Sequence, residues 1–193
     1  MLRLFVGLGI PYTLRLQLTA MNGGIPGARW VAAENLHLSL RFIGEVDEDT
    51  AEDIDAALGQ IFAEPVAVAL AGVGCFEKRG RANTVWAGAK ASPALLRLQA
   101  RVEAALQQAG LPPVGRKFTP HVTLARMQRL AVQNIAPYLS SHGGFRTEAF
   151  TVREFSLFRV YLGRKSADYE ILENYELYQR SLIKTHGPIF AVR

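Results

Sequence analysis

The chain of 193 residues contains a single cysteine, Cys75. One thiol cannot form an internal disulfide, and it cannot supply the set of thiolates that holds a structural zinc ion. Apolar residues make up 49% of the chain and charged residues 20%, which is an ordinary globular composition. The length allows one sizeable core, or two small lobes that share one.

Long apolar runs are also absent. No run approaches the roughly 20 residues that a membrane-spanning helix needs. The opening segment, residues 1–6, is too short and too soon interrupted by Arg3 to be a secretory signal peptide. We therefore expect no membrane partner and a cytoplasmic location.

Several motifs that mark enzyme classes are missing. The chain has no P-loop and no G-x-G-x-x-G, so a nucleotide cofactor is not indicated. It has no G-x-S-x-G elbow, which argues against a serine hydrolase. Histidines could bind zinc, but catalytic zinc usually has three protein ligands, and no H-E-x-x-H, H-x-H or nearby carboxylate completes such a set. We expect no metal and no cofactor.

Charge is unevenly distributed along the chain, whose net charge is +5. Residues 45–64 hold eight acids and no Lys or Arg, mostly at the start of an expected helix, where carboxylates interact favourably with the helix dipole. Residues 78–129 hold ten Lys or Arg and one acid, Glu103. This basic segment either attracts a polyanion such as RNA or forms an ordinary solvated surface. Charge alone leaves both alternatives open.

The most informative feature that is present is a short phrase, H-x-[ST]-L, which occurs at residues 37–40 and again 84 residues later at 121–124. Side chains alternate along a strand, so the histidine and the hydroxyl residue of each phrase share a face. Two imidazoles suit proton transfer near neutral pH, and two hydroxyls suit phosphate oxygens. A lone histidine on an apolar strand is more often a core residue, but the repetition indicates one site. Its candidate residues are His37, Ser39, His121 and Thr123.

The flanks of the two phrases repeat as well. Phe5, in an apolar strand at residues 2–8, lies 32 residues before His37, and Trp86, in a strand at 84–89, lies 35 residues before His121. A helix is expected between each pair, at 11–21 and at 93–109. Both halves therefore follow the order strand, helix, signature strand, which predicts two intertwined α+β lobes rather than two separable domains.

The signature strands themselves are expected at residues 36–43 and 121–126. The remaining pattern predicts helices at 47–63 and 132–139 and strands at 65–75, 145–151, 152–162 and 169–178. Residues 77–83 form the basic turn of a hairpin, and residues 163–168 form a second hairpin loop. The tail 179–193 stays unassigned.

Three residues beside the phrases are further candidates. Arg41 shares the face of His37 by parity. Arg126 is off parity with His121, but a side chain near a strand end can turn toward a cleft. Either guanidinium suits a phosphate, although a solvated arginine is the alternative for Arg41. Phe42 is a further candidate substrate contact. The two other histidines, which we interpret as surface residues, are His142 and His186.

These residues and their surroundings resemble the two-histidine (2H) phosphoesterases, and closely the RNA 2′,3′-cyclic phosphodiesterases historically called 2′-5′ RNA ligases. The segments that carry the resemblance are Arg3–Leu8, His37–Glu45, Val85–Gly88, Phe118–Arg126 and Ser156–Phe158. The resemblance extends over nearly all of residues 2–178. Ser39 stands where threonine is more usual, which keeps the hydroxyl, and residues 79–84 depart from the usual proline-arginine lead into the next strand.

The resemblance implies an α+β, bilobal 2H phosphoesterase fold, with two pseudo-symmetric lobes and antiparallel sheets around a central cleft. We accordingly expect one bilobal domain over residues 1–193, acting as a monomer on RNA with a terminal 2′,3′-cyclic phosphate and releasing a 2′-phosphate without metal or cofactor. By the same resemblance His37 is the proton donor and His121 the proton acceptor, while the phosphate is bound by Ser39, Thr123 and Arg126. The reverse reaction would form a 2′-5′ linkage without ATP.

Three alternatives stay open from the residues alone. The chain could be a phosphodiesterase for a small cyclic nucleotide or an ADP-ribose cyclic phosphate. It could be an RNA-binding module whose histidines only contact phosphates, or an inert scaffold. A cyclic-phosphate hydrolysis assay with and without EDTA separates an enzyme from a binder.

Overall fold

The computed structural model describes residues 1–163 and 167–178, which form a mixture of strands and helices. The strands are β1 (Leu2–Gly9), β2 (Arg29–Trp30), β3 (His37–Val46), β4 (Val66–Val68), β5 (Leu70–Lys78), β6 (Arg81–Ala89), β7 (His121–Ala131), β8 (Phe150–Val152), β9 (Glu154–Leu162) and β10 (Ala167–Glu176). The helices are α1 (Tyr12–Thr19), α2 (Glu48–Leu58), α3 (Pro93–Gln108) and α4 (Ala136–His142), with 3₁₀ turns at Ala33–Asn35 and Val132–Asn134.

Eight strands form one sheet in the order β10-β9-β1-β3-β7-β6-β5, with β2 beside β7. The two signature strands, β3 and β7, meet in the middle of this sheet through a single antiparallel residue pair, Leu38 and Val122. The sheet therefore divides at this junction into a β10-β9-β1-β3 half and a β7-β6-β5 half. The predicted α+β class with antiparallel strands is confirmed, and the two halves belong to one sheet.

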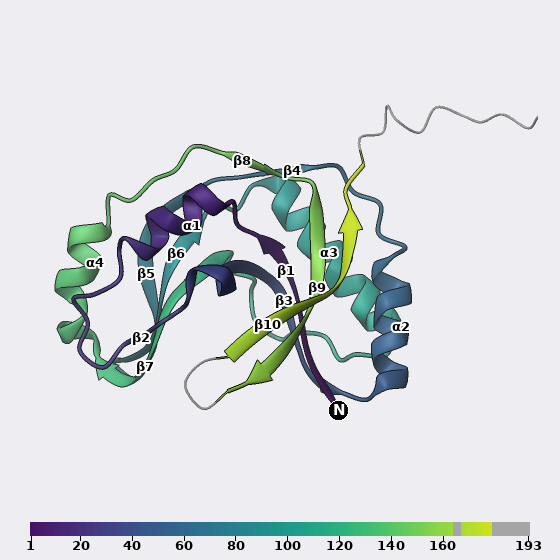
Figure 1. Ribbon diagram of the computed structural model, residues 1–193, viewed down its shortest axis with the longest axis horizontal. Helices are drawn as coiled ribbons and strands as arrows, with labels where there is room; N and C mark the ends of the chain where they lie inside the picture. The colour runs from purple at the N-terminus through teal and green to yellow at the C-terminus, as the bar shows by residue number, and fades with distance from the viewer. Residues whose placement is uncertain (164–166, 179–193) are drawn as a thin grey trace, which may run out of the picture.

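A helix that follows a strand of one half of the sheet lies against the other half. Helix α3 follows β6 in the chain but packs against β3 and β4. Figure 1 shows α2 and α3 on one side of the molecule, and α1 and α4 toward β5 and β6 on the other. Ser92 caps α3 by accepting a hydrogen bond from the backbone N–H of Leu95 at 3.2 Å. The helix then buries one face at helical spacing, through Leu95, Leu98, Val102 and Leu106.

The strands separate a core face from an open face. On β1, the side chains of Leu4, Val6 and Leu8 are almost completely covered. Leu38 and Leu40 of β3 are buried in the same way. Because side chains alternate along a strand, the intervening positions of both strands lie on the opposite face of the sheet. The histidine and the hydroxyl residue of the first phrase lie on that open face.

Several predicted elements differ in extent. The expected helix at 47–63 ends five residues early, at Leu58 in α2. The expected strand at 65–75 is broken at Ala69, because β4 pairs with β8 while β5 pairs with β6. Of the expected strand at 145–151, only the part in β8 is strand. The expected helix at 132–139 begins as a 3₁₀ turn, and α4 follows with Pro137 in its first turn, where a missing N–H is tolerated.

The basic hairpin is confirmed, but its turn has only two residues. Arg79 and Gly80 have φ values of 55° and 69°, and positive φ at both positions is the geometry that matches the twist of paired strands. The signature strands are longer at their ends than expected, since β3 extends to Val46 and β7 to Ala131. Part of the expected loop at 163–168, the tail 179–193 and His186 lie outside the described residues. Within the part of the chain that is described, no helix has the length and apolarity to cross a membrane.

Candidate active site

A β-bulge in β3 decides which of its side chains reach the open face. Gly7 pairs with Ser39, and Val6 pairs with Arg41, so Leu40 is an extra residue in β3. Directly paired residues of antiparallel strands point to the same face, and a bulge reverses the alternation beyond it. Arg41 therefore points to the core side with Val6, and not to the open side with Ser39.

The parity argument for Arg41 is thus wrong, and the bulge is the physical reason. Arg41 forms an ion pair with Glu103 of α3, with 2.7 Å between Nε and Oε2. The next residue, Phe42, pairs with Phe5 and lies on the open face, with half of its surface exposed. The guanidinium of Arg3 lies 5.5 Å from the centre of the Phe42 ring.

A matching bulge in β7 turns Arg126 toward the open face. Trp86 pairs with Thr123 and Thr84 pairs with Arg126, with Leu124 as the extra residue. Trp86 and Thr84 are two positions apart on β6 and share a face. Their partners Thr123 and Arg126 therefore share that face too, although simple alternation along β7 would place these two side chains on opposite faces.

The two phrases come together where β3 meets β7. Because the strands run antiparallel through the Leu38–Val122 pair, each histidine stands opposite the hydroxyl residue of the other strand. The two histidines are then diagonal neighbours, at positions whose Cβ atoms usually lie ~7–8 Å apart or somewhat less. The residues that the structure brings together here are His37, Ser39, His121 and Thr123.

Both imidazoles are oriented by a backbone carbonyl two residues upstream. Nδ1 of His37 donates to the Asn35 carbonyl at 2.8 Å, and Nδ1 of His121 donates to the Thr119 carbonyl at 2.7 Å. Since a carbonyl oxygen can only accept, Nδ1 carries the proton, and Nε2 has the lone pair when the ring is neutral. Nε2 of His37 accepts from the Ser39 hydroxyl at 2.9 Å. Both rings thus keep Nε2 for proton transfer.

Aromatic rings pack around both imidazoles. The centre of the Phe5 ring lies 4.4 Å from that of His37, and Tyr169 stands edge-on to His37 at 5.1 Å. Phe76 stands edge-on to His121 at 4.8 Å. Sequence reasoning did not single out Tyr169 or Phe76, because an isolated aromatic residue on a strand has the same pattern as an ordinary core residue. Their contacts restrict the rings around the fixed Nδ1 bonds.

Burial and positive charge disfavour the imidazolium form of both histidines. Burial, the guanidinium of Arg126 and the imidazole of His121 lower the pKa of His37 to about 4, against the opposing effect of its bond to Asn35. Burial, together with the charges of Arg116 and Arg126, also lowers the pKa of His121. Both rings are therefore neutral at pH 7 in the free protein. A bound phosphate anion would favour the charged form again.

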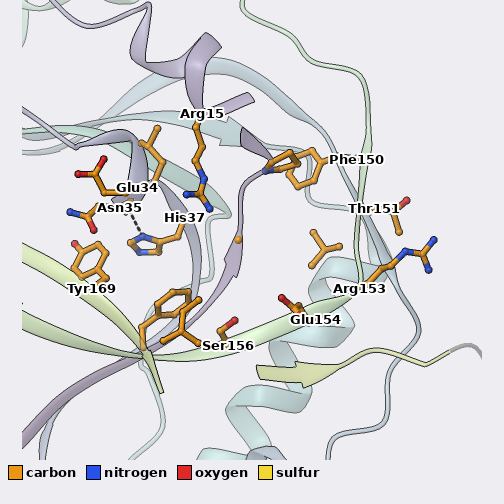
Figure 2. Close-up of a pocket in the computed structure, with 16 residues that line it drawn as sticks. Arg15, Glu34, Asn35, His37, Phe150, Thr151, Arg153, Glu154, Ser156 and Tyr169 are labelled. Carbon is orange, nitrogen blue, oxygen red and sulfur yellow. Dashed lines mark hydrogen bonds between the residues drawn. The ribbon is translucent and has the colours of Figure 1, made fainter. Parts of the chain in front are cut away.

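A pocket of about 440 Å³ adjoins His37. Figure 2 shows Glu34 beside His37 on one side of this pocket, Arg15 above them, and residues 150–154 on the far side. Nε of Arg15 donates to the Ile10 carbonyl at 2.6 Å, which fixes the guanidinium at the start of α1. Of the four signature residues only His37 lines this pocket, so the pocket lies beside the first histidine and not between the two histidines.

The other predicted features lie elsewhere. His142 lies at the end of α4, where its Nδ1 donates to the Tyr138 carbonyl at 3.0 Å. Among residues 1–163 and 167–178, no group of three or more His, Cys, Asp or Glu side chains is arranged to hold a metal ion.

Comparisons with known proteins give consistent matches. Residues 15–164 match the family model of the 2′-5′ RNA ligase superfamily. An RNA 2′,3′-cyclic phosphodiesterase of Aeropyrum pernix is 38% identical over 115 residues, which cover 59% of this chain and 65% of that protein. A protein of the same name from Thermus thermophilus is 30% identical over 188 residues, 91% of this chain and 90% of the relative. The crystal structure of E. coli LigT with 3′-AMP is similar with a TM-score of 0.76 and 28% identity, covering 92% of this chain and 99% of LigT.

Proposed function

Because the chain belongs to the 2′-5′ RNA ligase superfamily, we propose that it is an RNA 2′,3′-cyclic phosphodiesterase, which hydrolyses the terminal 2′,3′-cyclic phosphate of an RNA to a 2′-phosphate. The observation that carries the proposal is the pair of imidazoles whose Nδ1 atoms are fixed by carbonyls and whose Nε2 atoms are kept for proton transfer. The relatives described above carry this activity in their names. Both signature strands come from one chain, which is consistent with a monomeric enzyme.

The two histidines divide the proton transfers. Nε2 of neutral His121 takes a proton from water while the water oxygen bonds to phosphorus. The bond from phosphorus to O3′ breaks, and protonated Nε2 of His37 gives its proton to O3′. The product has a 2′-phosphate and a 3′-hydroxyl, and the positive charge has moved from His37 to His121. Exchange with solvent restores the starting protonation.

The hydroxyls and Arg126 stabilise the phosphate. When the Nε2 proton of His37 points at O3′, the Ser39 hydroxyl no longer donates to Nε2, and its hydrogen is free for a non-bridging phosphate oxygen. Thr123 donates to the phosphate from β7, where it stands opposite His37. Donors that are in place before the reaction favour the transition state, in which charge grows on these oxygens. The Arg126 guanidinium adds a positive charge on the same face.

The open face also provides contacts for the nucleotide. Phe42 is half-exposed on this face and offers a ring on which a base can stack, an interaction that tolerates any sequence. The basic hairpin with Arg79 and Arg81 lies on the same half as His121 and provides charge for the RNA backbone. RNA is therefore a better fit than a small cyclic nucleotide or an ADP-ribose cyclic phosphate.

An oligonucleotide with a terminal 2′,3′-cyclic phosphate should be converted to the 2′-phosphate at the same rate with and without EDTA. The measurement is chromatographic separation of the 2′- and 3′-phosphate products, with 2′,3′-cyclic AMP and an ADP-ribose cyclic phosphate as competing substrates. Binding without turnover would show an RNA-binding module. A preference for either small substrate would replace RNA by that substrate, and a loss of rate in EDTA would contradict metal-free chemistry.

Replacing Arg79 and Arg81 by glutamate should weaken capture of long RNA at low salt and leave a dinucleotide substrate almost unaffected. Each neutralised phosphate releases counterions. The loss of two phosphate contacts should therefore lower the slope of log KM against the logarithm of salt concentration by about two. The measurement is kcat/KM for both lengths between 50 and 200 mM salt, conditions at which such slopes are usually resolved. The double replacement of Arg97 and Arg101 by glutamate, at two exposed positions of α3, is the charge-matched control. An absence of salt dependence for long RNA would make the basic hairpin a solvated surface only.

A further inference from the structure

The loop of residues 111–120 connects α3 to His121 and contains neither helix nor strand. Its residues 112–117 are exposed, and it includes three prolines and Gly115. Two of its groups act directly on the proposed base: the Thr119 carbonyl accepts the Nδ1 hydrogen bond of His121, and Arg116 contributes positive charge near the ring. The position of this loop therefore bears on the chemistry at His121.

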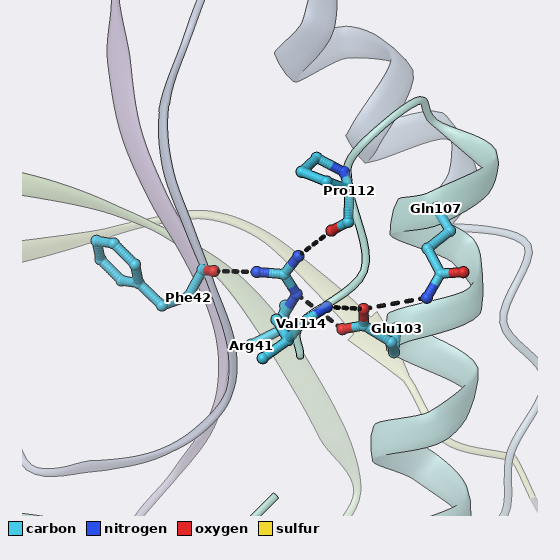
Figure 3. Close-up of polar contacts among 6 residues, drawn as sticks. All are labelled: Arg41, Phe42, Glu103, Gln107, Pro112 and Val114. Atoms are coloured by element: carbon cyan, nitrogen blue, oxygen red, sulfur yellow. Dashed lines mark hydrogen bonds and ion pairs between the residues drawn. The ribbon is translucent and has the colours of Figure 1, made fainter. Parts of the chain in front are cut away.

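Two charged side chains, Arg41 and Glu103, hold the loop in place, and we call this pair the clasp (Figure 3). Arg41 donates through Nη2 to the Pro112 carbonyl at 2.7 Å. Glu103 accepts through Oε1 from the backbone N–H of Val114 at 3.0 Å. Arg41 also donates through Nη1 to the carbonyl of Phe42, its neighbour on β3. Within the described part of the chain, residues 112–118 form no other hydrogen bonds than these to the clasp.

The clasp is well suited to fixing a position. The side chains of Arg41 and Glu103 are only 10% and 18% exposed, so their attraction is less screened than that of a surface ion pair. Breaking a partly buried pair by removing one member leaves the other charge without its partner. The bulge at Leu40 turns Arg41 to the core side, where Glu103 lies, and so makes the pairing with α3 possible.

The clasp also connects the two halves of the site. Arg41 belongs to β3, four residues after His37, and the loop leads into β7 at His121. The only backbone pairing between these strands is Leu38–Val122. The clasp thus provides a second link between the strand of the proposed acid and the segment that orients the proposed base.

We infer that Arg41 and Glu103 are positioning residues for the proposed reaction, and that they hold the loop so that Arg116, which is exposed and lies five residues before His121, binds the RNA backbone on the His121 side of the site. This inference rests on the proposed function and adds a phosphate-binding arginine to it. The charged groups that act on His121 are then Arg116 from the loop and Arg126 from β7, and His121 in turn acts on His37 of β3.

Kinetics of four variants test the coupling between clasp and loop. Glu103→Ala and Arg116→Ala should each raise KM for a dinucleotide cyclic phosphate about 10-fold, the usual size of one charge-assisted hydrogen bond, with a smaller change in kcat. The double variant should be no worse than Arg116→Ala alone, because both changes remove the same contact. Gln107→Ala is the control, since this side chain reaches Glu103 but neither the loop nor β3. Multiplying effects in the double variant would show that Glu103 has a structural role unrelated to Arg116.

NMR titration of His121 in the free protein gives a readout independent of activity. Glu103→Ala and Arg116→Ala should both raise the pKa of His121 toward its ordinary value, because a nearby positive charge is withdrawn. An unchanged His121 in Glu103→Ala would overturn the inference, whether or not the wild type hydrolyses RNA. If Glu103→Ala does not fold, Glu103→Gln provides the test, since it keeps an oxygen for Val114 but loses the ion pair. A smaller rise in the pKa of His121 in this variant supports the role of the clasp. A His121 that titrates as in the wild type refutes it.

Discussion

Alanine at either His37 or His121 should lower kcat for a cyclic-phosphate RNA by ~10²–10⁴-fold, the usual size of one acid–base contribution. The double variant should be far less than multiplicatively worse, because the two imidazoles act as a unit. His142→Ala is a matched control, since this ring belongs to α4 and bonds to Tyr138. Thermal unfolding should show that the single variants remain folded. Nearly full activity in either would contradict the acid–base assignment.

The pH dependence of wild-type activity should likewise reflect two histidines that act as acid and base. Both imidazoles have lowered pKa values in the free protein, with His37 at about 4, so the bell-shaped profile of kcat/KM should have its maximum below pH 6.5. Above the maximum, the fraction of protonated His37 falls with rising pH. The bound phosphate anion favours the imidazolium, so the optimum for kcat should lie at higher pH than that for kcat/KM. A flat profile between pH 5 and 8 in both parameters would exclude histidine as the acid.

Arg126→Ala should lower kcat/KM by ~10–100-fold, because a charge-assisted hydrogen bond to the reacting group typically contributes about 1.5–3 kcal/mol. Unlike changes in the basic hairpin, this loss should be similar for a dinucleotide and for long RNA. Arg126→Lys should recover part of the rate, since lysine keeps the charge but not the fork of the guanidinium.

A second effect of Arg126→Ala separates it from a simple loss of RNA affinity. The Arg126 charge lowers the pKa of both His37 and His121, so its removal should move the optimum of kcat/KM to higher pH. Arg97→Ala on α3 should change neither quantity. If the dinucleotide reacts at the wild-type rate in Arg126→Ala, Arg126 does not contact the phosphate.

The sequence was sufficient to predict the two signature strands and their fold class, because the repeated phrase lies in local patterns that alternation explains. The alternation of side chains along a strand predicts the wrong face for the residues that follow Ser39 and Thr123, because Leu40 and Leu124 are extra residues in their strands. In sequence both leucines have the pattern of ordinary core positions, and a bulge becomes visible only through the register of the neighbouring strand. This is why Arg41 was assigned to the wrong face and why Arg126 remained off parity.

Other parts of the site depend on contacts between residues far apart in the chain. Glu103 lies 62 residues from Arg41, and within its helix it has the pattern of a solvated acid. Tyr169 reaches His37 from β10, and no local pattern connects the two. Such residues become candidates only when the topology shows which elements are neighbours.

The paired bulges have a consequence for the direction in which a ligand lies. Each histidine is followed, five positions later, by a residue that its bulge turns to the open face: Phe42 after His37, and Arg126 after His121. The backbone is nearly two-fold symmetric there, but a ring occupies one of the equivalent places and a cation the other. Two placements of a phosphodiester on the open face that a two-fold rotation relates are therefore unequal in energy. The two ends of the open face therefore differ chemically, so the two histidines are not interchangeable, as the repeat alone would make them.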